Sequence, residues 1–252
     1  MERWAGRVAL VTGASAGIGA ALTRKLVKDG MKVAVCARRL DRLEALRDEL
    51  KGEPGAVLPI QCDLRKEDEI LAMFEKIKVT WGGVDVCVNN AGMNRNAPLL
   101  SGSTDDWRHI IDVNVLALCI CTREAVKSMQ ERGVDDGHII NINSTLGHKV
   151  GNFPAFHFLM GSKFSVTALT QGTRNELKGL KSHIRASSIS PGIVKTEALA
   201  LSFPDQPELV KHIHYSTKRM EADDVADAVI YALSAPPHVQ VEEVTVAGTE
   251  DE

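Results

Sequence analysis

The amino-acid sequence predicts an α/β fold with a doubly wound, mostly parallel sheet of seven strands and helices on both faces. Short β-branched runs alternate with longer helical patterns along the whole chain. The strand-like runs are almost entirely apolar, so each strand must be covered on both faces, and alternation with helices provides that cover only in a parallel sheet. No linker, composition shift or internal repeat interrupts the alternation. We therefore expect residues 1–252 to form a single domain of the Rossmann type.

Each expected strand is a short run rich in β-branched or aliphatic residues. In chain order these runs span residues 8–11, 33–36, 56–61, 84–89, 138–142, 184–190 and 239–244. A longer helical pattern follows each of the first five runs, at residues 17–29, 40–50, 67–80, 104–132 and 155–180, and a last helix is expected at 221–233. The sixth strand leads instead into an irregular excursion, 196–220, which carries Pro204 and Pro207. Loops of that length in a compact domain are usually functional, and we interpret this one as a substrate lid.

The charge balance and the cysteines exclude several classes of protein. Lys and Arg number 30 against 33 Asp and Glu, for a net charge of −3, and no basic stripe with interleaved aromatic residues is present. Nucleic acid is therefore not an expected partner. The five cysteines include no CxxC pair and are interpreted as reduced core thiols. A strand begins within a few residues of Met1, and no apolar stretch reaches the roughly 20 residues that cross a bilayer, so we expect a cytoplasmic protein without a signal peptide or membrane span.

The first strand runs into a glycine turn of the form TGxxxGxG, at which a helix opens. Its members with a predicted binding role are Gly13, Ser15, Ala16, Gly17, Ile18 and Gly19. Glycines let the backbone turn sharply and let a pyrophosphate approach the helix amino terminus, where free N–H groups and the helix dipole favour an anion. The alternative is a tight strand-to-helix connection that needs no ligand. The position after the first strand of a βαβ unit favours dinucleotide binding.

Arginine rather than a carboxylate follows the second strand, at Arg38 and Arg39. An NAD-selective site would place a carboxylate about there to bond the ribose hydroxyls, whereas arginine matches a 2′-phosphate. This pattern favours NADP(H) as the cofactor, and the alternative is a solvated pair of surface arginines. Asp63, followed by Leu64, comes after the third strand and is placed to bond the adenine amino group; the alternative for Asp63 is a helix cap.

Further motifs stand in order along the chain: Asn89-Asn90-Ala91-Gly92 after the fourth strand, then Asn114, Ser144, Lys163 and Pro191-Gly192. Together with the glycine turn they make the chain resemble the short-chain dehydrogenase/reductase family over essentially its whole length. The resemblance implies NADP(H)-dependent reduction of ketosteroids or other apolar carbonyls, or oxidation of the matching alcohols. We assign no metal site.

The resemblance also implies a role for each matching residue. Asn114 matches the asparagine that holds a water in a proton relay, and Ser144 matches the serine that bonds the substrate carbonyl oxygen. Lys163 matches the lysine that bonds the nicotinamide ribose and lowers the pKa of a neighbouring phenol. The cofactor-binding positions that match the family are Asn90, Ala91, Gly92, Pro191, Gly192, Ile193, Val194 and Thr196. Taken singly, each motif also fits a structural role: a mid-helix asparagine, a turn serine, a surface lysine or a strand-ending turn.

The family's YxxxK motif lacks its tyrosine in this chain, because the position four residues before Lys163 is Leu159. Residues i and i+4 share one helix face, so a tyrosine there would reach the cofactor together with the lysine. Leucine supplies no proton, and losing a positioned acid costs about 10² to 10⁴ in rate. Residual turnover would rely on proximity to the nicotinamide and on the Ser144 hydroxyl, with water as the proton source.

His157 is not expected to replace the tyrosine, since six residues of helix turn it roughly 120° away from Lys163. Two explanations of Leu159 stay open. The chain is an engineered or disabled variant of an active enzyme, or it is a chain repurposed as a non-catalytic NADP-binding or scaffold protein.

The substrate site is expected beyond the carboxyl ends of the strands, lined by residues 93–99, residues 147–158 and the lid. The apolar side chains in these segments are Phe153, Phe156, Phe158, Leu199, Leu201 and Phe203. No Lys or Arg cluster is present there to bind a carboxylate or phosphate, so we expect an uncharged, apolar carbonyl or alcohol as the small-molecule partner. The alternative is that the phenylalanines pack the core.

The two long helices, 104–132 and 155–180, are apolar beyond one face. Members of the family pair these helices, which implies a homodimer or homotetramer in which Ala117, Ala125 and Ala168 permit close approach. The alternative is burial of these faces within one subunit.

Overall fold

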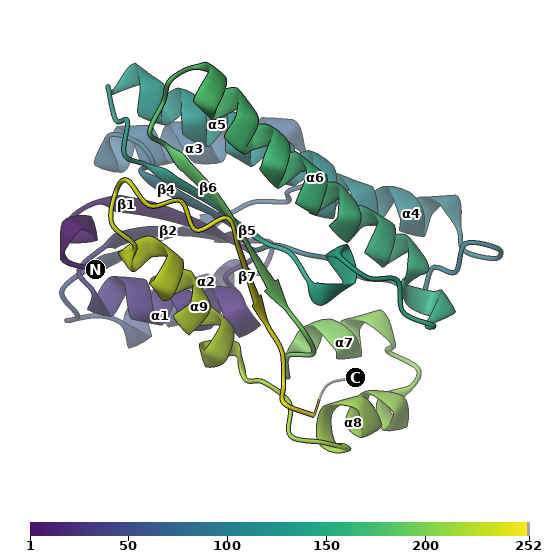
Figure 1. Ribbon diagram of the computed structural model, residues 1–252. Helices are drawn as coiled ribbons and strands as arrows, with labels where there is room; N and C mark the ends of the chain where they lie inside the picture. The colour runs from purple at the N-terminus through teal and green to yellow at the C-terminus, as the bar shows by residue number, and fades with distance from the viewer. Residues whose placement is uncertain (251–252) are drawn as a thin grey trace.

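A computed structural model describes residues 1–250 and shows a seven-stranded sheet in which every paired strand is parallel (Figure 1). The strands are β1 (Val8–Thr12), β2 (Lys32–Ala37), β3 (Ala56–Gln61), β4 (Val86–Asn89), β5 (His138–Ile142), β6 (Arg185–Pro191) and β7 (Glu243–Val246). Their order in the sheet is β3-β2-β1-β4-β5-β6-β7. The predicted α/β architecture with a parallel sheet is confirmed.

Helices cover both faces of this sheet. They are α1 (Gly17–Lys28), α2 (Leu40–Glu49), α3 (Glu67–Trp81), α4 (Thr104–Ile111), α5 (Ala117–Glu131), α6 (His157–Gly179), α7 (Glu197–Ser202), α8 (Pro207–Tyr215) and α9 (Ala222–Ser234). Helices α1, α2 and α9 lie on one face, and α3, α5 and α6 lie on the other (Figure 1). No helix formed by residues 1–250 is both long and apolar enough to span a bilayer.

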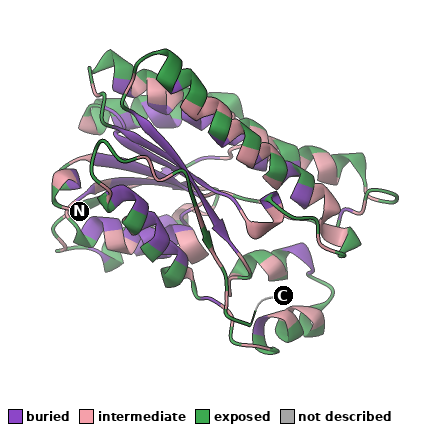
Figure 2. Ribbon diagram, in the orientation of Figure 1, coloured by how far each residue is buried: buried purple, intermediate pink, exposed green. Residues whose placement is uncertain are grey.

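The two faces of the central strands explain why these strand sequences are apolar throughout. In β1, Ala9 and Val11 belong to the core under α1, α2 and α9, whereas Val8 and Leu10 belong to the core under α3, α5 and α6. Alternate residues of a strand point to opposite faces, so a strand with a helix layer on each side needs apolar residues at every position. Figure 2 shows the central strands buried and the outer surfaces of the helices exposed, whereas the edge strand β7 is partly exposed.

The last strand begins later than expected, at Glu243 rather than near Val239. The side-chain amide of Gln240 bonds the backbone of Ala186 in β6, accepting from its N–H at 3.2 Å and donating to its carbonyl at 3.0 Å. The Gln240 side chain therefore occupies the backbone groups of Ala186 that a longer β7 would bond, and β7 pairs with β6 only after this point.

The excursion at 196–220 is not irregular, because it contains α7 and α8. Pro207 occupies the first position of α8, where the missing N–H of proline costs nothing, and Pro204 lies between the two helices. The prolines that favoured a loop in the sequence thus mark a helix start and a helix connection.

The expected helix 104–132 is interrupted by a π-helical turn, Asp112–Leu116, between α4 and α5. Two of the alanines expected at a subunit contact are buried within the protomer, Ala117 at 2% exposure and Ala125 at 0%, in the core between the sheet and α5. That part of the prediction is wrong, since side chains that pack under the sheet are unavailable to a second subunit. Ala168, on α6, is exposed.

Candidate active site at the carboxyl edge of the sheet

The strand order fixes where a ligand site can form. Chain order reverses between β1 and β4, because β2 and β3 lie on one side of β1 and the later strands lie on the other. In open α/β sheets ligands bind at such a switch point, outside the carboxyl ends of the strands. The loops that leave these ends, and the helices they enter, carry the predicted site residues.

The glycine turn after β1 is closely packed and tolerates no side chain at its key positions. A Cβ atom on Gly13 would lie 2.8 Å from the Cα of Ala91, and one on Gly19 would lie 2.6 Å from the Nδ2 of Asn90. Gly13 and Gly17 also have positive φ angles of 69° and 55°, which side chains disfavour. The glycines are therefore required by the backbone of the turn as well as by any ligand.

The turn leaves the amino terminus of α1 open to an anion. The helix starts at Gly17 after Ala16, whose side chain has no oxygen to cap the first N–H groups, and its first turn holds no acidic residue. Free N–H groups and the positive end of the helix dipole therefore meet at this point. Pyrophosphate is the kind of group that such a helix terminus binds.

The Asn90-Ala91 loop after β4 is fastened to the glycine turn through Thr12. The Thr12 hydroxyl accepts from the backbone N–H groups of Asn90 and Ala91, each at 3.0 Å. The Asn90 amide donates to the carbonyl of Thr12 at 2.8 Å and, at 3.3 Å, to that of Gly13. These bonds hold the two loops together on either side of the switch point, as a single rigid platform.

The two arginines after β2 point to different places. Arg39 donates to the Ser15 hydroxyl of the glycine turn at 3.1 Å and to the Glu197 carboxylate of α7 at 3.2 Å. Arg38 lines a groove of about 940 Å³ that also includes Asp63 and lies beside the edge strand β3. Arg39 thus reaches the glycine turn, whereas Arg38 faces the groove beside β3.

Asp63 is not a helix cap, because α3 begins only at Glu67, and it instead accepts from the backbone and guanidinium of Arg65. The hydrogen bond from Arg65 lowers the pKa of Asp63 to about 2. The carboxylate is therefore ionised and already paired, in the same groove as Arg38.

Asn114 lies within the π-helical turn and is buried. Its amide oxygen accepts from the N–H of Met93 at 2.7 Å, while its nitrogen donates to the carbonyl of Met93 at 2.9 Å and to the Ser162 hydroxyl at 3.1 Å. Single π-helical turns are frequent at functional sites, and this one turns Asn114 between the loop after β4 and α6.

Ser144 follows β5 and begins a 3₁₀ turn, Thr145–Gly147. Its hydroxyl accepts from the N–H of Leu146 at 3.1 Å and donates to the carbonyl of Pro191 at 3.4 Å. The second bond is long, so the hydroxyl hydrogen is weakly held and remains free to turn toward a substrate oxygen.

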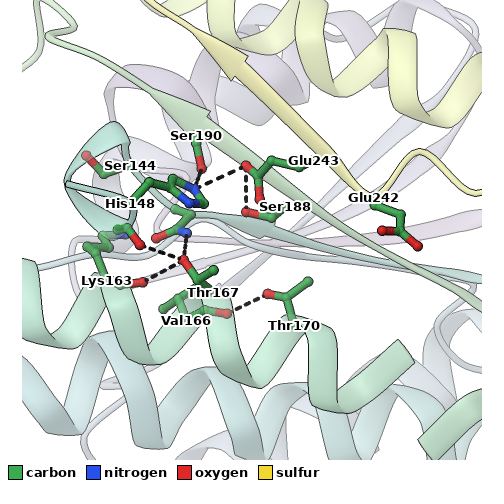
Figure 3. A network of polar contacts seen from close by, with 12 residues as sticks. Ser144, His148, Lys163, Val166, Thr167, Thr170, Ser188, Ser190, Glu242 and Glu243 are labelled. Atoms are coloured by element: carbon green, nitrogen blue, oxygen red, sulfur yellow. Dashed lines mark hydrogen bonds and ion pairs between the residues drawn. The ribbon is translucent and has the colours of Figure 1, made fainter. Parts of the chain in front are cut away.

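A network of polar contacts fixes the loop that carries Ser144 (Figure 3). His148 lies 3.0 Å from the hydroxyl of Ser190 and 3.6 Å from the carboxylate of Glu243, which joins the loop to β6 and β7. Thr167 of α6 donates to the carbonyl of Gly147 at 2.9 Å. The serine is therefore positioned by contacts to two strands and to α6.

Lys163 and Leu159 both lie in α6, four residues apart on one helix face. The ammonium of Lys163 donates to the carbonyl of Ile142 at the end of β5, at 2.9 Å. Burial lowers the pKa of Lys163 to about 8. Leu159 is partly buried, so the apolar side chain stands one turn before this ammonium, where the family's motif has a phenol.

The two residues before Leu159 are engaged elsewhere. The Nε2 atom of His157 lies 3.1 Å from the carbonyl oxygen of Gly151. The ring of Phe158 stacks on Trp107 of α4, with ring centroids 5.4 Å apart. His157 is therefore a partly buried histidine with a backbone partner, as the rotation along the helix indicated.

Aromatic side chains connect the loop before α6 to the lid. Phe156 stacks on Phe153 at 5.7 Å and meets Phe203 of the lid edge-on at 5.5 Å. Phe203 is buried, whereas Phe153 is 49% exposed and Leu201 is 60% exposed; Leu199 is partly buried. The segments expected to surround a substrate do meet, and they offer apolar surface.

The segment after β6 runs back toward the glycine turn. Gly192 donates from its N–H to the carbonyl of Val246 in β7 at 2.8 Å, and Val194 forms a parallel bridge with Met220. Thr196 then packs against Gly17, because a Cβ on that glycine would lie 3.2 Å from the Thr196 methyl carbon. The expected contact segment thus lies beside the amino terminus of α1.

Three residues of the site were not predicted from the sequence. Thr12 bonds the loop after β4, and Ser162 is the hydroxyl partner of Asn114. Glu197 accepts hydrogen bonds from Arg39 and Arg42. Ser162 could have been found from its place beside Lys163 in the motif. Thr12 and Glu197 act across distances of 78 and 155 or more residues, which no local pattern reports.

This fold and this arrangement of residues define the class of protein. The chain belongs to the short-chain dehydrogenase/reductase family of oxidoreductases: residues 7–207 match the family described as short chain dehydrogenase. The chain is 55% identical to dehydrogenase/reductase SDR family member 11 of Gallus gallus, over 99% of both chains. It is 45% identical to the farnesol dehydrogenase of Aedes aegypti, over 98% of this chain and 97% of the relative.

A solved structure supports the same class. The closed form of serine dehydrogenase complexed with NADP⁺ superposes with a TM-score of 0.88 at 31% identity, covering 97% of this chain and 96% of that one. Our recognition of the family from separated motifs is confirmed.

Proposed function

We propose that the protein is an NADP(H)-dependent oxidoreductase that reduces ketone or aldehyde groups of apolar substrates, ketosteroids among them, or oxidises the matching alcohols. The observation that carries this proposal is the packed glycine turn with Arg39 bonded to its Ser15, directly after Arg38 at the end of β2. Ser144 follows β5, and Lys163 of α6 bonds the carbonyl at the end of β5, so both lie at the same carboxyl edge of the sheet as that turn.

The residues present fit a phosphorylated dinucleotide. The uncapped start of α1 suits the pyrophosphate, and Gly13 and Gly17 give the turn before it a tight backbone path at positive φ. Arg38 and Arg39 suit the 2′-phosphate, because one guanidinium can bond two phosphate oxygens through two parallel N–H donors. The Asn90-Ala91 loop and Thr196 border the path from the turn toward the reacting end.

When bound, the nicotinamide supplies or accepts a hydride. Lys163 would supply a positive charge and a donor for a ribose hydroxyl, while Ser144 would donate to the carbonyl oxygen that gains charge during reduction. Asn114 joins the loop at Met93 to Ser162 of α6 and so holds the loop after β4 against that helix. Without a phenol at Leu159, the proton for the new alcohol comes from water beside Ser144.

An apolar substrate is supported by the lid and by the loop before α6. Phe153 and Leu201 expose apolar surface, and the Phe156–Phe203 contact joins the two segments. The farnesol dehydrogenase relative is named for an apolar alcohol. Acidic sugars should therefore be poor substrates, and rates with them that match those with steroid ketones or prenyl alcohols would contradict this part of the proposal.

One observation favours a second candidate, a non-catalytic NADP-binding or scaffold protein. Leu159 offers no proton, and the imidazole of His157, two residues before it, is engaged with the carbonyl of Gly151. Such a protein would keep the cofactor site and the fold while turning over no carbonyl.

We also propose a homodimer or homotetramer and a cytoplasmic setting. Phe164 and Leu116, on the outer side of α6 and of the π-helical turn, are 40% and 52% exposed and suit a contact between copies. All five cysteines are free, and burial raises the pKa of the Cys87 thiol to about 12, so this thiol is protonated at neutral pH. Sedimentation that detects only monomer would contradict the assembly.

Two measurements on one sample separate the candidates. A cofactor-fluorescence titration reports NADPH binding, and loss of reduced-nicotinamide absorbance with a panel of apolar ketones and aldehydes reports turnover. Binding with measurable turnover supports the oxidoreductase. Saturable binding with no turnover on any carbonyl supports the non-catalytic candidate, and absence of binding refutes both.

A further inference from the structure

A carboxylate of the lid, that of Glu197, forms hydrogen bonds with two arginines that follow β2, Arg39 and Arg42. Glu197, the first residue of α7, accepts from Arg42 at 2.8 and 2.9 Å and from Arg39 at 3.2 Å. Arg39 at the same time donates to Ser15 of the glycine turn at 3.1 Å. Hydrogen bonds from Arg42 and then Arg39 hold the pKa of the Glu197 carboxyl below its usual value, so the group is an anion.

The position of this anion coincides with the proposed 2′-phosphate position. Carboxylate and phosphate oxygens are equivalent acceptors for a guanidinium, which bonds either group through paired N–H donors. A phosphate that bonds Arg39 beside Ser15 must therefore share or take the donors that Glu197 now uses. Two anions cannot occupy that guanidinium together without repulsion.

The contact is of the kind that a phosphate can displace. The side chains of Arg39, Arg42 and Glu197 are 39%, 41% and 48% exposed. Ion pairs at such exposure contribute little to stability, because water and salt screen them. A phosphate monoester carries about −1.5 to −2 charges against the single charge of a carboxylate, so it binds the same donors more strongly.

The lid is held at few places near its start. Its two ends are joined by the Val194–Met220 bridge and by a hydrogen bond from the N–H of Lys195 to the carbonyl of Met220 at 2.9 Å. Beyond that base, α7 contacts the cofactor side through Glu197, directly after Thr196 has packed against Gly17. Release of Glu197 therefore removes the hydrogen bonds that tie the first turn of α7 to Arg39 and Arg42.

We propose that Glu197 is an internal competitor of the cofactor's 2′-phosphate. Its carboxylate occupies Arg39 and Arg42 until a phosphorylated cofactor replaces it, and that replacement detaches the start of the lid from the cofactor site. An unphosphorylated dinucleotide leaves the contact in place, so the residue links the state of the lid to the presence of the phosphate. The inference rests on the proposed function, since it needs the 2′-phosphate to lie at Arg39.

The test compares two small probes that differ in the 2′-phosphate, adenosine 2′,5′-bisphosphate and 5′-AMP, by calorimetry on the full chain. Glu197→Gln is expected to tighten binding of the bisphosphate by about threefold to tenfold, the size expected for removing one exposed ionic competitor. Binding of 5′-AMP is expected to stay within about twofold. The matched control is Glu208→Gln, which removes one charge from an exposed position of the same lid on α8. Equal effects of the two substitutions on the bisphosphate would overturn the proposal, because they would indicate a general charge effect.

A double substitution locates the effect. In an Arg39→Gln background, Glu197→Gln is expected to lose most of its influence on bisphosphate binding, since the shared donor is gone. Full retention of the influence in that background would contradict competition at Arg39.

Hydrogen exchange reads the lid directly. Amides of α7 are expected to exchange faster with the bisphosphate than with 5′-AMP in the wild-type chain, and equally fast with both in Glu197→Gln. Slower or unchanged exchange with the bisphosphate in the wild-type chain would overturn the link to the lid. Titration of the wild-type chain with NADPH separates the two levels of failure: if NADPH binds while Glu197→Gln changes nothing, only this inference fails, and if NADPH does not bind, the proposed function fails with it.

Discussion

Replacing Leu159 with tyrosine would place a phenol one helical turn before Lys163. The two positions share a face of α6, and the nearby ammonium, whose pKa burial lowers to about 8, remains charged at pH 7 and favours ionisation of a phenol beside it. Leu159 is only partly buried, so the larger ring should cost less than about 1.5 kcal/mol of stability. A positioned acid contributes about 10² to 10⁴ in rate, which corresponds to about 2.7 to 5.4 kcal/mol of activation free energy.

The assay is NADPH oxidation with the ketone that the wild-type chain turns over best. Leu159→Phe is the matched control, since it adds the ring without the hydroxyl. We expect kcat of Leu159→Tyr to exceed that of Leu159→Phe by about 10² or more. Reduction by the tyrosine variant should also slow at alkaline pH as the phenol loses its proton. Equal rates in the two variants, both with NADPH bound, would refute the view that only the acid is missing and would mean that the pocket has diverged.

Three further outcomes follow from the site. In the Leu159→Tyr background, Ser144→Ala should lower kcat by about 10², and an unchanged kcat would remove the serine from the carbonyl site. The desolvated ammonium of Lys163 destabilises the fold below about pH 8, where it is charged, and this penalty disappears as the pH rises toward 10.5. The unfolding free energy of Lys163→Met relative to wild type should therefore fall by about 2 kcal/mol between pH 7 and 10; parallel denaturation curves would contradict it. Gly13→Ala should cost about 1–3 kcal/mol of stability and weaken NADPH binding, because its Cβ meets the loop after β4 at a positive φ, whereas Gly172→Ala, with open space around its Cβ, should be neutral or stabilising.

The sheet could be predicted because the central strands are buried on both faces. Such burial requires apolar residues at successive positions, which the sequence shows as apolar runs. The edge of the fold was less predictable. Before β7, the side-chain amide of Gln240 forms the hydrogen bonds to β6 that a strand backbone would otherwise form. The apolar run in the sequence gives no sign of this substitution. The expectation that residues 196–220 are irregular was wrong for a related reason, since Pro207 starts a helix as readily as it lies in a loop.

The site divides in the same way. The glycine turn, the arginines after β2 and the Ser144 and Lys163 positions follow from short motifs, each tied to the end of one strand or one turn of helix. The π-helical turn around Asn114 adds one residue to a helix, which leaves no trace in a 3.6-residue pattern. The bonds between Glu197 and the arginines join α7 to α2, so only the packed structure shows them.

The most direct test of the central claim is a crystal structure of the protein grown with saturating NADP⁺. We expect the 2′-phosphate against Arg38 and Arg39, the pyrophosphate at the start of α1, and the nicotinamide ring beside Ser144 and Lys163. Absence of bound dinucleotide under those conditions, or a dinucleotide bound away from the carboxyl ends of β1 and β4, would contradict the account.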